Sequence, residues 1–227
     1  MPFASFIDPL TMVLDLLVLM TAVVFYTGVF VWYNARKGDT ARATVSLREG
    51  AVLITLLGAV LGLVALWGEF NWPFSAADGL ASYNLYFFDP ILLLALLTVS
   101  FGLAVLFRLP THFVGMMGVV IGCGVMYYGA RADYYLKLTQ DPLETLLMYL
   151  AFGAVAIMAY PATLYVDWFV TGRQNPALTP IASAPTPTYP RMWTVLLAIF
   201  IILVILAGLA AAAYGIAAGW GHLESAP

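Results

Sequence analysis

The chain contains six apolar runs, and each is close to the length that an α-helix needs to cross a lipid bilayer. A crossing takes roughly 20 apolar residues, because a helix rises about 1.5 Å per residue through a hydrocarbon layer about 30 Å thick. The runs cover about residues 9–33, 47–68, 90–107, 113–129, 143–168 and 192–218. Only 9% of the 227 residues are charged, against roughly 25% in a soluble domain. The sequence therefore predicts an all-α bundle of six transmembrane helices, a single membrane domain over residues 1–227.

Positively charged residues indicate which side of the membrane each connection faces, because Lys and Arg concentrate in cytoplasmic loops. The first, third and fifth connections hold seven of the nine, namely Arg36, Lys37, Arg42, Arg48, Arg108, Arg173 and Arg191. We therefore expect these connections in the cytoplasm and both chain ends outside, an N-out, C-out topology. The fifth connection, 172–190, is rich in Pro, Thr and Ala and is expected to be a flexible cytoplasmic linker.

Three aspartates, each followed by proline, open predicted helices: Asp8, Asp89 and Asp141. An aspartate before a helix caps the free N–H groups of the first turn, and proline loses no hydrogen bond at the first helical position. We therefore expect the three aspartates to be the N-caps of the first, third and fifth helices. Capping is preferred to the alternative, in which the repeated motif marks duplicated helical hairpins.

The long polar interruption between residues 67 and 90 carries two acids at predicted helix ends, Glu69 and Asp89. Glu69 falls at the C-terminal, negative end of the second helix, where an acid is mildly unfavourable, so capping does not explain it. The candidate outer-loop motif between the two acids consists of Asn71, Trp72, Pro73, Tyr83 and Asn84. The aromatic residues of this segment fit an interfacial belt, and a groove for a quinone or lipid is the alternative.

Asp15 lies seven residues into the first predicted helix, roughly 10 Å along it from Asp8 at 1.5 Å per residue. A carboxylate inside the membrane is costly and indicates a function by default. We therefore take Asp15, Glu69 and Asp89 as a candidate ion or proton path. The alternative is that Asp15 bonds a neighbouring helix or stays in contact with water at the interface.

The sequence offers no ligand set for a metal or cofactor. The two histidines, His112 and His222, are predicted on opposite sides of the membrane, and two axial ligands of one haem must meet at one iron. No Cys-x-x-Cys pair or zinc-ligand spacing is present. We therefore expect no catalytic residue, metal or cofactor. The net charge of −3 argues against a nucleic-acid partner.

Four short motifs that precede or connect the first three predicted helices resemble a known family. They are Phe6-Ile7-Asp8-Pro9, Trp72-Pro73, Tyr83-Asn84 and Phe88-Asp89-Pro90. Together they resemble the DUF981 prokaryotic integral membrane proteins, whose pattern has Trp-Pro, Tyr-Asn and then aromatic-Gly-Asp-Pro. Phe88 stands here at the glycine position. The resemblance implies a multi-helix protein of a prokaryotic cell membrane and brings no activity or catalytic residue with it.

Three functions are compatible with these features. The small size and the lack of cofactor ligands favour a non-catalytic accessory or structural subunit of a membrane complex, in contact with lipid and with partner subunits. One alternative is a small transporter or an ion- or proton-conducting protein that uses Asp15 and Glu69. A second is a quinone- or lipid-interacting membrane enzyme. Transport ranks below the accessory role because a coupled transporter usually has several intramembrane acids and this sequence shows one clear case.

Overall fold

The structure, a computed structural model, describes residues 9–71, 73, 82–135, 142–171 and 191–224. Within these residues the α-helices are α1 (Pro9–Arg36), α2 (Thr40–Asn71), α3 (Ser82–Leu106), α4 (His112–Gly129), α5 (Pro142–Tyr165) and α6 (Arg191–Glu224). Two π-helical turns, η2 (Ala130–Tyr135) and η3 (Val166–Val170), extend α4 and α5. Six helical spans are long and apolar enough to cross a membrane, which confirms the predicted all-α membrane bundle. The predicted linker 172–190, Asp8, Trp72 and Asp141 lie outside the described residues.

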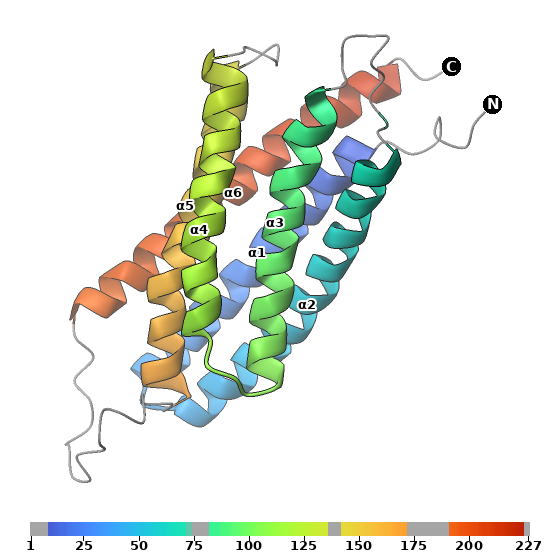
Figure 1. Ribbon diagram of the computed structural model, residues 1–227. Coiled ribbons are helices and arrows are strands. Elements are labelled where there is room, and N and C mark those ends of the chain that lie inside the picture. The colour runs from blue at the N-terminus through green and yellow to red at the C-terminus, as the bar shows by residue number, and fades with distance from the viewer. Residues whose placement is uncertain (1–8, 72, 74–81, 136–141, 172–190, 225–227) are drawn as a thin grey trace.

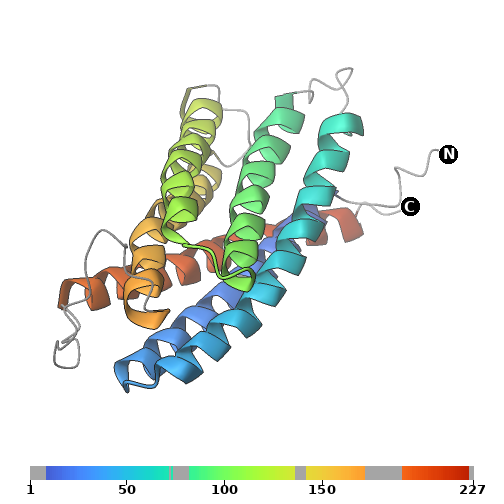
Figure 2. The same cartoon turned by 60° about the horizontal axis from the view of Figure 1, so that its bottom comes forward.

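The six helices form a closed ring. Each helix packs against the next one along the chain, and α6 closes the ring by packing against both α5 and α1. Figure 1 shows α3 and α4 side by side at the front, with α6 crossing obliquely behind them. In Figure 2, α4 and α5 stand as a pair beside α3. The α3–α4 contact is the least extensive in the ring.

The two ends of the ring differ in charge. The starts of α1, α3 and α5 and the ends of α2, α4 and α6 lie together (Figure 1). We call this the acidic end, because it carries Glu69 and Asp89. The opposite end, the basic end, carries Arg36, Lys37, Arg42, Arg48, Arg108 and Arg191. Which end faces the cytoplasm stays a prediction.

Asp89 is not the N-cap of α3, and that prediction is wrong. The helix begins at Ser82 rather than near residue 90, so both Asp89 and Pro90 lie inside it. An internal proline leaves the carbonyl four residues earlier without its amide donor. That carbonyl belongs to Tyr86, and the Tyr149 hydroxyl on α5 donates to it at 2.6 Å. A side chain from another helix thus replaces the missing bond, and α3 continues through Pro90.

α2 is longer than predicted, because it begins at Thr40 rather than near residue 47. Asp39 caps it: the carboxylate accepts the backbone N–H of Arg42 at 2.9 Å and pairs with the Arg42 side chain at 3.3 Å. The first turns of α2 are polar and partly exposed, so hydropathy alone does not reveal them.

Glycines bring neighbouring helices close enough for backbone atoms to meet. On α4, a Cβ atom at Gly122 would lie 2.4 Å from the carbonyl oxygen of Gly153 on α5. On α2, a Cβ atom at Gly58 would lie 2.5 Å from the Thr98 hydroxyl on α3. Helices in lipid associate largely through such close packing, since lipid tails are as apolar as the side chains. These glycines therefore set the spacing of the α4–α5 and α2–α3 pairs.

We predict that Gly122→Ala lowers the free energy of unfolding by about 1–3 kcal/mol, because the added methyl group meets a backbone oxygen. Gly124→Ala is the matched control on the same helix, since its Cβ would have Leu93 Cδ1 as nearest neighbour at 4.0 Å. Thermal unfolding in detergent should show a lower Tm for the first variant alone. Equal Tm values for the two variants would contradict this packing.

The support of the Tyr86 carbonyl by Tyr149 also leads to a test. Tyr149→Phe should cost about 1–3 kcal/mol of stability, because a buried carbonyl loses its donor. Pro90→Ala restores a backbone N–H to the same carbonyl, so Tyr149→Phe should cost clearly less in that background. A double-mutant cycle followed by thermal unfolding measures the coupling. An equal loss of stability in both backgrounds would show that the Tyr149 hydroxyl does not replace the hydrogen bond that Pro90 removes.

Candidate functional site

Three side chains from three helices meet at the acidic end. The Tyr128 hydroxyl on α4 donates to Asp89 Oδ2 on α3 at 2.5 Å, and the Glu69 side chain on α2 lies near the same Asp89 carboxyl group. Two neighbouring carboxylates repel each other, and one proton held between them relieves that repulsion. Glu69 Oε1 is buried and has no hydrogen-bond partner among the described residues. The cluster is thus a candidate site for binding a proton.

The residues just before the two acids bring them together. A Cβ atom at Gly68 would lie 2.5 Å from the ring of Phe88, so the absence of a side chain lets α2 approach α3 at this point. Phe88 is 1% exposed and holds the start of α3 in the core. Glu69 and Asp89 follow these two residues directly in the sequence, and the close approach therefore places the two acids near each other.

The structure does not bring Asp15 to this pair. Its side chain is exposed, and Oδ1 lies 3.5 Å from where a Cβ atom of Gly215 on α6 would be. The buried face of α1 is made instead by its neighbours Val13, Leu14 and Leu17. Asp15 therefore faces α6.

The outer-loop motif is distributed over the ends of α2 and α3. Asn71 is exposed and donates to the Trp67 carbonyl at 2.7 Å, which closes the last turn of α2. Tyr83 packs on Phe87 with ring centroids 5.7 Å apart. Asn84 is fully buried, whereas Pro73 is half-buried. These residues shape the wall of the acidic end, and Trp72 lies outside the described residues.

A second polar cluster at the basic end escaped the sequence interpretation. Asp167 on η3 is 1% exposed, and its carboxylate accepts the backbone N–H groups of Thr111 and His112 at 2.9 Å each. The Thr111 hydroxyl and His112 Nδ1 approach it at 2.9 and 2.8 Å. These N–H groups form the start of α4, where no earlier turn supplies acceptors and the helix dipole favours a negative charge. Asp167 therefore caps α4 from a distant segment of the chain.

We predict that Asp167→Asn destabilises the protein by about 1.5–3 kcal/mol, because an amide replaces a carboxylate that accepts charge-assisted bonds. Asp39→Asn is the matched control, since Asp39 caps α2 but is exposed and Asn caps nearly as well as Asp. Thermal unfolding of both variants should show a large drop in Tm only for the first. A drop of equal size in the control would indicate that burial of the cap is unimportant.

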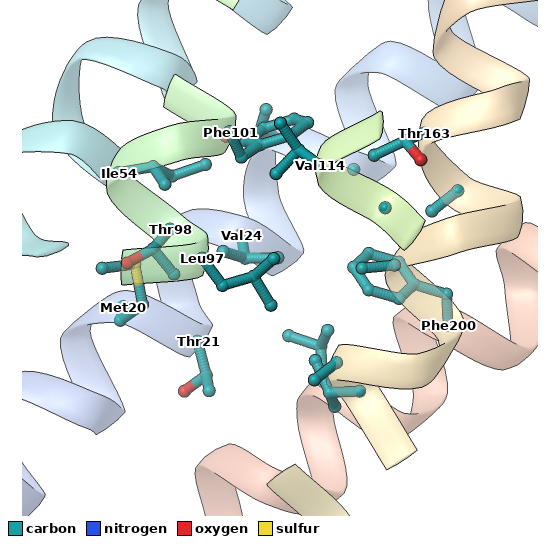
Figure 3. A pocket seen from close by; sticks show the side chains of 18 of the residues that line it. Met20, Thr21, Val24, Ile54, Leu97, Thr98, Phe101, Val114, Thr163 and Phe200 are labelled. Carbon is teal, nitrogen blue, oxygen red and sulfur yellow. The ribbon is translucent and has the colours of Figure 1, made fainter. Parts of the chain in front are cut away.

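An apolar cavity of about 150 Å³ lies inside the ring, and all six helices contribute to its wall. Figure 3 shows side chains from α1 to α6 turned toward it, among them Leu97, Phe101 and Phe200. Threonines also line it, but the hydroxyls of Thr21 and Thr163 donate to carbonyls of their own helices. Such bonding leaves the methyl groups to face the cavity. In the described part of the chain, no three His, Cys, Asp or Glu side chains gather as metal ligands.

The ring of apolar helices defines a multi-pass α-helical membrane protein. Its outer surface exposes large apolar side chains, such as Leu63, Val120 and Ile216, as contact with lipid requires. The chain belongs to a family described as protein of unknown function (DUF981), whose model matches residues 1–225. The family resemblance drawn from the short motifs is thereby confirmed. No curated protein and no solved structure matches the chain.

Proposed function

We propose that the protein is a small proton-linked transporter whose proton-binding site is the Glu69–Asp89 pair. The observation that carries the proposal is that these two acids, contributed by α2 and α3, lie close together where Gly68 packs on Phe88, with Glu69 Oε1 buried and without a hydrogen-bond partner among the described residues. Two neighbouring acids in a membrane helix bundle are costly, and such groups commonly belong to proton relays. Asp15 faces α6 and is not needed for this site.

The position of the pair in the ring supports a coupled movement. The Tyr128–Asp89 hydrogen bond joins α3 to α4, and these two helices share the least extensive contact in the ring. Gain or loss of a proton at the pair changes how strongly Asp89 accepts this bond. Proton binding would therefore change a hydrogen bond across the α3–α4 interface, which has the least packing in the ring.

The experiment is a proton-flux assay with purified protein in liposomes that contain a pH-sensitive dye. Glu69→Gln and Asp89→Asn should each lower the flux by about tenfold or more, because an amide cannot take up and release the proton as a carboxyl group does. Glu144→Gln is the matched control: Glu144 is exposed in the first turn of α5, at the same end. Its flux should stay at the wild-type level.

Unchanged flux in both pair variants would rule out the site. If wild-type liposomes show no flux while a stoichiometric partner copurifies from host membranes, the protein is an accessory subunit instead. Mass spectrometry of the complex in mild detergent makes that distinction.

A further inference from the structure

A polar pocket of about 190 Å³ opens at the basic end, between α2, the α3–α4 connection and η3. Its polar lining consists of two arginines, Arg48 and Arg108, and three threonines, Thr44, Thr111 and Thr171. The threonine hydroxyls already donate to oxygens of the protein itself. The two guanidinium groups are therefore the donors that the pocket offers to a ligand.

Neither arginine of the pocket is paired with an acid in the described part of the chain. Asp39 pairs with Arg42, and Asp167 is occupied at the start of α4. Glu49 is exposed, and adjacent side chains on a helix do not face each other. Residues 172–190, which lie outside the described part of the chain, contain no Asp or Glu. The pocket thus carries an excess of positive charge.

Arg108 occupies a backbone position that normally belongs to glycine. α1 and α3 both end with the same pair of capping hydrogen bonds, in which the residue after the helix adopts a left-handed conformation. At the end of α1 this residue is Gly38, with φ 79°, whereas at the end of α3 it is Arg108, with φ 57°. A side chain in this conformation is strained, because its Cβ atom crowds the backbone, whereas glycine has no Cβ atom. A strained residue at a pocket suggests a role in binding rather than in folding.

The polar pocket adjoins the apolar cavity inside the ring. Leu47 and Val166 line both spaces, so these side chains form part of the boundary between them. The cavity is walled almost entirely by apolar atoms, and a dry apolar space of this kind accepts hydrocarbon rather than water. Two arginines without an acidic partner among the described residues therefore lie next to a space suited to an apolar chain.

We propose that the basic-end pocket and the adjoining cavity together bind an amphiphile with a phosphate-bearing headgroup. Arg48 and Arg108 hold the phosphate, because guanidinium groups bind phosphate oxygens through paired N–H donors. The apolar chain of the ligand enters the ring past Leu47 and Val166. The location at the basic end of the spans is the level at which the phosphate groups of a lipid leaflet lie.

The test is native mass spectrometry of the protein in dodecyl maltoside, titrated with dodecyl phosphate or with inorganic phosphate. The detergent supplies a neutral amphiphile of the same chain length throughout, so added binding reports the phosphate group. Wild type should bind one dodecyl phosphate, and Arg48→Gln and Arg108→Gly should each weaken that binding by about tenfold or more. Arg108→Gly should also keep or raise the Tm, because glycine relieves the left-handed position. If Arg108 served only to stabilise the fold, its replacement would not weaken binding while leaving the Tm unchanged or higher.

Arg42→Gln is the control, since it removes the same charge from the same end but lies outside the pocket. Its binding should equal that of wild type. A loss in this control as large as in the pocket variants would overturn the proposal in favour of general surface attraction. Wild-type binding by both pocket variants would overturn it as well. If inorganic phosphate binds as tightly as dodecyl phosphate, the site is one for free phosphate, and the role of the cavity is disproved.

Discussion

The constraint on which the whole structure depends is that backbone polar groups inside a bilayer must find their partners within the protein. A continuous helix meets it by itself, but a helix that is interrupted or that begins at depth does not. The chain meets it twice with side chains from other helices. The Tyr149 hydroxyl serves the carbonyl that Pro90 leaves without a donor, and Asp167 serves the first N–H groups of α4. These bonds tie α5 and η3 to α3 and α4 across the ring.

Glycine sets the spacing of the ring and thereby decides where its empty space lies. Where Gly122 meets Gly153, the α4 and α5 backbones nearly touch, and the same happens where Gly58 faces α3. Neighbouring helices are therefore closely packed against each other. Six helices arranged in a ring nevertheless leave a cavity at the centre. The central cavity is thus a product of the same close contacts that hold the helices together.

The sequence predicted what depends on local pattern and missed what depends on contacts between distant segments. Six spans could be predicted from hydropathy because a membrane helix requires a continuous apolar run of about 20 residues. Glu69 could be singled out because nothing local explains an acid at the negative end of a helix. The closeness of Glu69 to Asp89 could not be derived, since it depends on how closely Gly68 lets α2 approach Phe88.

Two of the errors at helix starts have one physical cause, a contact with a distant segment of the chain. An Asp-Pro pair looks like a helix start from the sequence, and Asp89 departs from that rule because Tyr149, far along the chain, makes an internal Pro90 tolerable. Asp167, by contrast, is a cap that no local sequence pattern indicates. It reads as one polar residue near the end of an apolar run, and its role appears only when the start of α4 is placed beside it.

The apolar centre of the ring limits how a proton could move between the two ends. The acidic end holds the Glu69–Asp89 pair, the basic end holds Asp167 and His112, and the cavity between them is lined by apolar atoms and by threonines, some with hydroxyls bonded to their own helices. A static proton wire needs polar groups or water in sequence, and a dry cavity offers neither. Transport through this ring would therefore require helices to move. The α3–α4 interface is the part of the ring best placed for such movement, because its contact is least extensive and the Tyr128–Asp89 bond that bridges it depends on the protonation of the acidic pair.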